Sequence, residues 1–108
     1  KDFEKLTAAY ELKLISMLGY KPNLKHCLSC GKEIKADSEF SIKEGGLFCH
    51  ECVNYGSGIN VTYGEILTME KILKSKFENI DSVEVNKKVL QLIRNFCFII
   101  SARMILLH

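Results

Sequence analysis

The segment from Cys27-Leu28-Ser29-Cys30 to Cys49-His50-Glu51-Cys52 carries the strongest structural signal in this chain. Two C-x2-C pairs separated by eighteen residues are typical of a structural zinc site. Zinc takes four ligands in a tetrahedron with bonds of about 2.3 Å to sulfur, and each C-x2-C turn presents two thiolates to the same ion. The sequence therefore predicts one closed structural zinc site whose ligands are Cys27, Cys30, Cys49 and Cys52.

The residues between the two thiol pairs predict a short β-hairpin. Residues 39–43 alternate between polar and apolar side chains, Glu44-Gly45-Gly46 is a turn signal, and Leu47-Phe48 leads back toward Cys49. A two-stranded hairpin is marginal by itself in water. Zinc binding contributes about 10–16 kcal/mol to the folding of isolated finger peptides, so the metal would supply the missing stability.

A helix is expected on the N-terminal side of the thiol pairs, from Asp2 to Leu18. Its apolar residues recur at helical spacing, and the stripe is wide enough to predict burial on more than one side. Gly19 and Pro22 are the expected stop signals. The residues of the stripe are Phe3, Leu6, Tyr10, Leu14, Met17 and Leu18, widened by Ala9, Leu12 and Ile15.

A second helix is expected after the second thiol pair. Residues 54–60 are rich in glycine and are interpreted as a loop. Thr62 and Glu65 then have the spacing of a capping box, in which each side chain accepts a hydrogen bond from the backbone of the other residue. We expect this helix to run to about Phe77 and to bury one apolar face.

The last helix is expected from about Val83 to Leu107, after a loop over residues 79–82, with Asp81 or Ser82 as its cap. The stretch from Val89 to Leu107 is the best candidate for a membrane span. Polar residues interrupt this stretch, and a central arginine costs roughly 2.5–3.5 kcal/mol on insertion into a bilayer. We therefore interpret it as a buried core helix and expect no membrane partner.

Length and composition fit one small domain. The chain has 108 residues, of which 47% are hydrophobic and 26% charged, as in ordinary globular proteins. We expect a single mostly α domain over residues 1–108, with about three helices and a four-cysteine zinc finger at 25–55 on a short β-hairpin. Because the chain starts at Lys1 rather than Met, we expect it to be part of a longer protein. The formal charge of +2 is too small to indicate a nucleic-acid partner.

Two histidines and one cysteine have simple interpretations. His26 and His50 each lie next to a ligand cysteine, and we expect them to be exposed or to donate hydrogen bonds to the ligands. Cys97 lies in the apolar run from Phe96 to Ile100 and is expected to be a small buried hydrophobe. The sequence contains no P-loop, G-x-S-x-G or H-E-x-x-H motif, so we expect no enzymatic activity.

Basic residues occur in loose groups along the chain. They indicate either a solvated face, since acidic residues are nearly as numerous, or a surface that follows the phosphates of a nucleic acid. Tyr20 or Tyr55 would then be available for stacking on bases. The residues that we consider as contacts to nucleic acid or to a partner are Lys32, Lys35, Lys71, Lys74, Lys87, Lys88, Arg94 and Arg103.

The chain also resembles a known family, most clearly over residues 10–62. The motifs that carry the resemblance are Tyr10-Glu11-Leu12, Leu18-Gly19-Tyr20, the two thiol pairs, and Phe40-Ser41 leading to Gly45-Gly46-Leu47-Phe48. In these motifs the chain is similar to the C-terminal domain of the bacterial recombination mediator RecO. The resemblance implies a helical domain with a zinc finger held by the four cysteines, and a separate N-terminal OB-fold that binds DNA and is absent from this chain.

The resemblance also implies a function and partners. RecO proteins anneal single strands, act with RecR, and help to load recombinase onto DNA coated by single-strand-binding protein, whose acidic tail some C-terminal domains receive. We therefore expect a non-enzymatic mediator in the bacterial cytoplasm, associated with the nucleoid, whose single-stranded DNA binds mainly to the OB-fold. Where many members carry an arginine, this chain has Ala8 and Ala9, so a tail pocket would need another cation, for which Lys5 and Lys13 are candidates.

Two other hypotheses remain open at the level of the sequence. The first is a free-standing zinc-ribbon adaptor that binds nucleic acid directly, which a basic stripe on the hairpin would favour. The second is a thiol redox sensor that loses its zinc on oxidation. Because the terminal helices are unusually apolar for so small a domain, we also expect that some of their faces lack a partner within the chain and support a homodimer.

Overall fold

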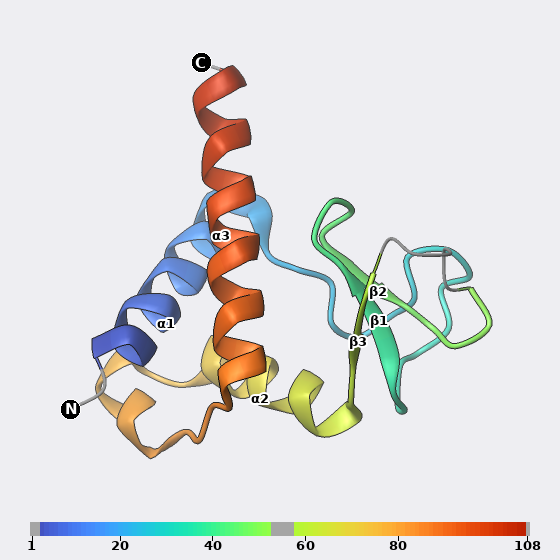
Figure 1. The fold of residues 1–108 in the computed structure, drawn as a ribbon, viewed down its shortest axis with the longest axis horizontal. Helices are drawn as coiled ribbons and strands as arrows, with labels where there is room; N and C mark the ends of the chain where they lie inside the picture. Colours follow the sequence, from blue (N-terminus) through green and yellow to red (C-terminus); the bar gives the residue numbers. More distant parts are fainter. Residues whose placement is uncertain (1–2, 53–57, 108) are drawn as a thin grey trace. The chain divides into compact units, whose positions relative to one another are not determined.

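The computed structural model describes residues 3–52 and 58–107, which form two compact units. We call Lys1–Lys21 together with Thr68–His108 the helical unit, and Pro22–Leu67 the cysteine unit. Most of the regular structure is helical, and a small antiparallel sheet lies in the cysteine unit (Figure 1). The predicted fold class, mostly α with a four-cysteine cluster on a short hairpin, is confirmed.

The helical unit is built around the longest helix of the described structure. It contains α1 (Phe3–Ile15), the π-helical turn η1 (Ser16–Tyr20), the second half of α2 (Tyr63–Lys74), the 3-10 helix η2 (Phe77–Ser82) and α3 (Lys87–Leu107). Helix α1 packs beside α3, as Figure 1 shows in blue and in orange to red. The buried residues of this unit are Ala8, Ala9, Leu12, Ile15, Met69, Ile72, Ile80, Val83, Val89, Leu92, Ile93, Phe96, Cys97 and Ile100.

The buried face of α1 is only part of the stripe that the spacing predicted, namely Ala9, Leu12 and Ile15. Ala8 and Ala9 are buried, because small side chains let the helix approach its neighbours closely. Leu12 and Ile15 are buried beside them, whereas Phe3 and Met17 are 75% and 83% exposed. The predicted burial on more than one side is therefore wrong for α1. Gly19 ends the segment as expected, with φ of 98°, a conformation that glycine adopts without strain.

The connection from α2 to α3 is more ordered than predicted. Helix α2 ends at Lys74 instead of Phe77, and residues 77–82 form the 3-10 helix η2 instead of a loop. Helix α3 begins at Lys87, and its cap is Asn86, whose side-chain oxygen accepts a hydrogen bond of 2.8 Å from the amide of Val89. Neither of the two predicted caps serves this helix, because the burial of Ile80 and Val83 holds the preceding segment in the core.

Helix α3 has the length and the apolar character of a core helix. From Lys87 to Leu106 it is long and apolar enough to cross a membrane by these two criteria, and 39% of its most apolar window is buried. One face of it packs into the helical unit through residues such as Leu92 and Phe96. Phe98, Ile105 and Leu106 of the same helix are exposed, so the prediction of a buried core helix holds for one face of α3 only.

The cysteine unit is organised by a three-stranded antiparallel sheet. Strands β1 (Ser38–Ser41), β2 (Gly46–Phe48) and β3 (Ile59–Val61) lie in the order β2-β1-β3. The predicted hairpin is confirmed as β1 and β2, with Phe40 opposite Leu47. Strand β3 was not predicted, because it falls partly in the stretch interpreted as a loop. Residues 54–57 of that stretch, with the candidate stacking residue Tyr55, lie outside the described residues.

Candidate metal centre

Backbone hydrogen bonds position the first thiol pair against β2. The amide of Leu28 donates to the carbonyl of Leu47 (2.9 Å), which joins the turn between Cys27 and Cys30 to the strand that precedes Cys49. The turn closes through a hydrogen bond from the amide of Gly31 to the carbonyl of Cys27 (3.0 Å). Gly31 has φ of 78°, which explains why glycine follows the second thiol.

The second thiol pair follows β2 directly. Cys49 comes after the last residue of the strand, and the amide of Cys52 donates to its carbonyl at 2.9 Å. At the start of β2 the backbone at Gly46 lies close to Asn23 and Leu28, in the segment that carries the first thiol pair. A Cβ atom on Gly46 would lie 3.0 Å from both residues, so only glycine fits there without a shift. The hairpin thus brings the second pair alongside the first.

The four thiols converge on one point. The Sγ atoms of Cys27, Cys30, Cys49 and Cys52 all lie within 4.8 Å of one another, and those of Cys30 and Cys49 are 3.7 Å apart. A tetrahedron with metal–sulfur bonds of about 2.3 Å has edges of about 3.8 Å. The donor set therefore fits a four-coordinate metal ion, and with four protein ligands it leaves no position open for a substrate.

The electrostatic surroundings prepare one thiol for metal binding. Burial raises the pKa of Cys27, but hydrogen bonds from the backbone, including the amides of Ser29 and Cys49 at 3.4 Å each, outweigh this effect and lower the pKa to about 6. The pKa of Cys52 is raised to about 12, mainly by hydrogen bonds with the thiols of Cys49 and Cys30. The ligand form of cysteine is the thiolate, so a bound cation would displace the remaining protons.

The centre is open to solvent on one side. Cys27 and Cys49 are buried, whereas Cys30 is exposed and Cys52 is partly exposed. Sequence reasoning identified the four thiols but not the amides of Ser29 and Cys49, although the glycine after the first pair suggested that backbone amides would face the sulfurs. Such contacts depend on backbone direction, which residue spacing does not specify.

The remaining histidines and cysteine lie where the sequence suggested. His26 and His50 are exposed. Cys97 is buried in the helical unit, and its pKa is raised to about 12, first by burial and second by the charge of Glu11. Cys97 is therefore a neutral thiol at physiological pH and packs as a small hydrophobe.

The basic residues considered as contacts divide between the two units. In the cysteine unit, Lys32 pairs with Glu51 at 3.6 Å and Lys35 with Glu33 at 3.9 Å. In the helical unit, the candidates on α2 and α3 are exposed, and they are Lys71, Lys74, Lys87, Lys88, Arg94 and Arg103. The lysines nearest the metal centre in sequence thus do not form an uninterrupted positive surface.

The two lysines of α1 that were candidates for an acidic tail have structural partners. Lys5 donates to the carbonyls of Asp81 and Val83, at 3.2 and 3.0 Å, and Lys13 donates to the carbonyls of Leu73 and Ser75. Lys13 thereby caps the C-terminal end of α2, where a cation also suits the helix dipole. Both ammonium groups support the connection between α2 and α3.

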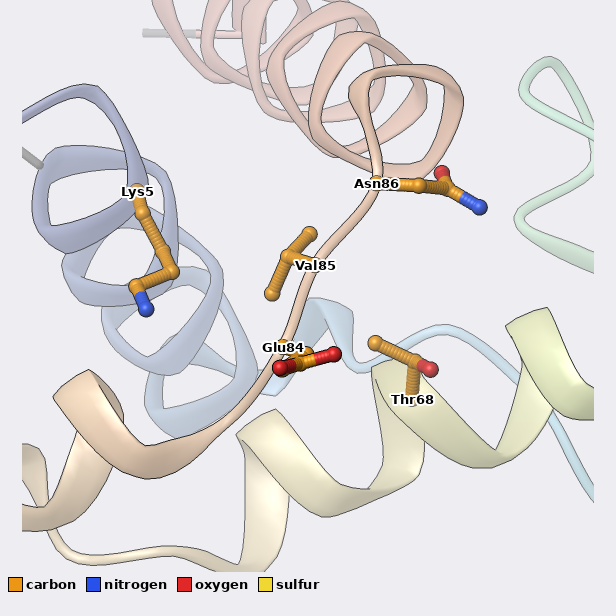
Figure 2. Close-up of a pocket in the computed structure, with 5 residues that line it drawn as sticks. All are labelled: Lys5, Thr68, Glu84, Val85 and Asn86. Carbon is orange, nitrogen blue, oxygen red and sulfur yellow. The ribbon is translucent and has the colours of Figure 1, made fainter.

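Lys5 also lines a polar cavity of about 610 Å³ in the helical unit. Figure 2 shows Lys5 reaching from α1, with Glu84 and Thr68 among the other lining residues, while the side chain of Asn86 points away from Lys5. The cavity carries both a cation and a carboxylate, and the cation already donates to two carbonyls. This combination does not select one chemical class of ligand.

Together, these features define a helical protein with a four-cysteine finger that can hold one metal ion in a closed site. The family model described as "Recombination protein O C terminal" matches residues 2–98. The chain belongs to this family.

Curated relatives carry the corresponding name. The chain is 36% identical over 86 residues to the DNA repair protein RecO of Alkaliphilus metalliredigens, and this match covers 79% of this chain and 35% of the relative. It is 38% identical over 77 residues to RecO of Symbiobacterium thermophilum (68% and 30%) and 34% identical over 88 residues to RecO of Clostridium acetobutylicum (82% and 35%). The chain thus spans about a third of the length of these relatives. No solved structure gave a significant match.

Proposed function

We propose that this chain is the finger-bearing C-terminal part of a RecO-type mediator of DNA repair and recombination, and that it catalyses no reaction. The observation that carries the proposal is the convergence of four thiols within 4.8 Å in a chain that belongs to this family. A closed set of four protein ligands stabilises a fold and offers no site for chemistry on a substrate.

The metal that we propose is zinc, with Cys27, Cys30, Cys49 and Cys52 as its ligands. Four thiolates at tetrahedral spacing suit zinc, which has no redox chemistry and takes this geometry in structural sites. The ion would tie the turn before β1 to the turn after β2. It would thereby hold together a unit whose strands have only three or four residues each.

The partners that we propose follow from the family. The domain would act with RecR and with the acidic tail of single-strand-binding protein, and would support strand annealing and recombinase loading in the cytoplasm, at the nucleoid. Single-stranded DNA would bind mainly to a separate OB-fold. The exposed apolar residues of α1 and η1, among them Phe3, Tyr10 and Met17, are consistent with a further protein contact, including a homodimer.

Calorimetric titration of the purified chain tests this proposal. RecR from a related bacterium and a peptide with the acidic tail of single-strand-binding protein are the two probes. Saturable binding of either probe, with no binding of a scrambled tail peptide, is the expected result. Specific partners typically bind with dissociation constants below about 100 μM. If neither probe binds to the zinc-loaded chain at this concentration, the mediator proposal fails.

The zinc-ribbon adaptor is less well supported than the mediator. The cysteine unit contains four lysines against six acidic residues, a formal charge of −2, and Lys32 and Lys35 are already close to carboxylates. Such a surface repels phosphates. The redox sensor has one supporting observation, the exposure of Cys30, and loss of zinc after mild peroxide treatment would favour it.

A further inference from the structure

Positive charge in this chain is concentrated in the helical unit. That unit contains eleven Lys and Arg against seven Asp and Glu, a formal charge of +4, whereas the cysteine unit has a formal charge of −2. Four thiolates and one divalent cation would make the cysteine unit more negative still. A surface for a polyanion is therefore expected on the helices and not on the finger.

The solvent-facing side of α3 presents basic, amide and aromatic residues in one stripe. Lys87, Gln91, Arg94, Asn95 and Phe98 follow one another at intervals of three, four or one residues, which places them on one side of the helix. All five are exposed, and Phe98 is 72% exposed.

The opposite side of the same helix is the one that packs into the unit. Val89, Leu92, Ile93, Phe96 and Ile100 are buried. Phe98 is therefore not part of the core, although it lies within the apolar run from Phe96 to Ile100. An exposed aromatic ring among basic and amide side chains is a feature of surfaces that bind single-stranded nucleic acid.

We propose that this stripe of α3 binds single-stranded nucleic acid, with Phe98 as the platform on which a base stacks. Lys87 and Arg94, together with the neighbouring Lys88, would contact phosphates. This inference rests on the proposed function and adds a binding site in the helical unit to the one expected in the OB-fold. A stacked base must be unpaired, so the stripe would select single strands over duplexes.

The polar contacts within the stripe are compatible with this role. The side-chain amide of Gln91 donates a hydrogen bond of 3.2 Å to the side-chain oxygen of Asn95, and both side chains remain at the surface. Arg94 lies 3.8 Å from Glu4, but both side chains are about half exposed, and an exposed pair of this kind is weak and screened by salt. A phosphate can therefore compete with Glu4 for Arg94.

The same geometry separates the basic residues that belong to the stripe from those that do not. Arg103 follows Arg94 by nine residues, which corresponds to a rotation of about 180° around the helix. Lys71 and Lys74 lie on α2. We therefore assign Lys87, Lys88 and Arg94 to the site and leave Arg103, Lys71 and Lys74 outside it.

Two tryptophan probes test the stacking. The chain contains no Trp, so Phe98→Trp and Phe77→Trp each introduce a single fluorophore, one in the stripe and one at an exposed position outside α3. Titration with a 20-nucleotide oligothymidine should quench the fluorescence of F98W and leave F77W nearly unchanged. A duplex of the same length should quench neither. Equal quenching of both variants, or none in F98W while the strand binds, would overturn the proposal.

Matched charge variants test the phosphate contacts. Fluorescence anisotropy of a labelled oligothymidine gives the salt dependence of binding for K87Q/K88Q and for the control K71Q/K74Q, which removes the same charge from the same unit. The slope of log K against log salt should fall in magnitude by about 1.4 in K87Q/K88Q and remain unchanged in the control. Equal changes of the slope in the two double variants would assign the binding to overall charge and overturn the proposed site. Absence of binding by the unmodified chain would overturn it as well. Neither result would affect binding of RecR or of the acidic tail, so the two proposals fail separately.

Discussion

The Sγ atoms of Cys30 and Cys49 lie 3.7 Å apart, although nineteen positions of sequence separate the two residues. This separation is close to the edge of a zinc–thiolate tetrahedron, about 3.8 Å. The hydrogen bond from the amide of Leu28 to the carbonyl of Leu47 aligns the two turns from which these thiols come. The backbone thus brings the ligands together, and a metal ion would hold them there.

Removal of the metal should unfold the cysteine unit selectively. One zinc ion per chain is expected by native mass spectrometry, and a chelator should abolish the protection of the amide of Leu47 from hydrogen exchange. The amides of α3 around Phe96 should keep their protection, because the buried residues of the helical unit include none of the four ligands. Unchanged protection of Leu47 after complete removal of zinc would contradict the structural role of the site.

Gly46→Ala should destabilise the cysteine unit by about 1–3 kcal/mol. The added methyl group would lie 3.0 Å from both Asn23 and Leu28, in the segment that carries the first thiol pair. Urea denaturation of the zinc-loaded chain measures this loss. Gly64→Ala is the matched control, because its nearest contact would be 3.7 Å away and alanine is preferred in a helix by about 0.5–1 kcal/mol. A loss of equal size in both variants would argue against close packing at Gly46.

Thr62→Ala should lower the free energy of unfolding by about 1 kcal/mol. The side chain of Thr62 accepts a hydrogen bond of 3.1 Å from the amide of Glu65, and the carboxylate of Glu65 accepts one of 2.9 Å from the amide of Thr62. Thr62→Ser should restore the stability, whereas Thr7→Ala, at an exposed position in α1, should leave it nearly unchanged. Thermal unfolding followed by circular dichroism compares the four proteins, and a stable T62A would rule out the capping role.

Cys97 should make stability fall at alkaline pH. Burial, and secondly the charge of Glu11, raise the pKa of this thiol to about 12 in the folded chain, from an ordinary value of 9.0. Above pH 9 the unfolded chain therefore loses this proton first, and the contribution of the neutral thiol to stability decreases as the pH rises from about 9 to about 12. The difference in unfolding free energy between the unmodified chain and Cys97→Ala should shrink over this range.

A constant difference between these two proteins from about pH 8 to about pH 11 would show that the thiol is not protected. An alkylating reagent gives an independent measurement at mildly alkaline pH. The folded chain should react slowly at Cys97, and the denatured chain should react fast, because the thiolate is the nucleophile.

Local patterns in the sequence were sufficient for several parts of this molecule. Two C-x2-C pairs, a glycine turn and a T-x-x-E sequence predicted the thiol cluster, the hairpin and the start of α2. The turn and the capping box depend on bonds between residues close in sequence, and the two thiol pairs predict one cluster because four cysteines at this spacing suit a single tetrahedral ion. The membership of the family was also recognisable from short motifs around the thiol pairs.

Other features depend on which surfaces meet in space. Residues 59–61 pair with β1 although their neighbours indicated a loop, and the start of α3 is set by Asn86 because Ile80 and Val83 are buried before it. In α1, Ala8, Ala9, Leu12 and Ile15 face the core, whereas Phe3 in the same helix and Met17 in η1 are exposed. Periodicity identifies an apolar helix, but the neighbour that packs against the helix selects which side is buried.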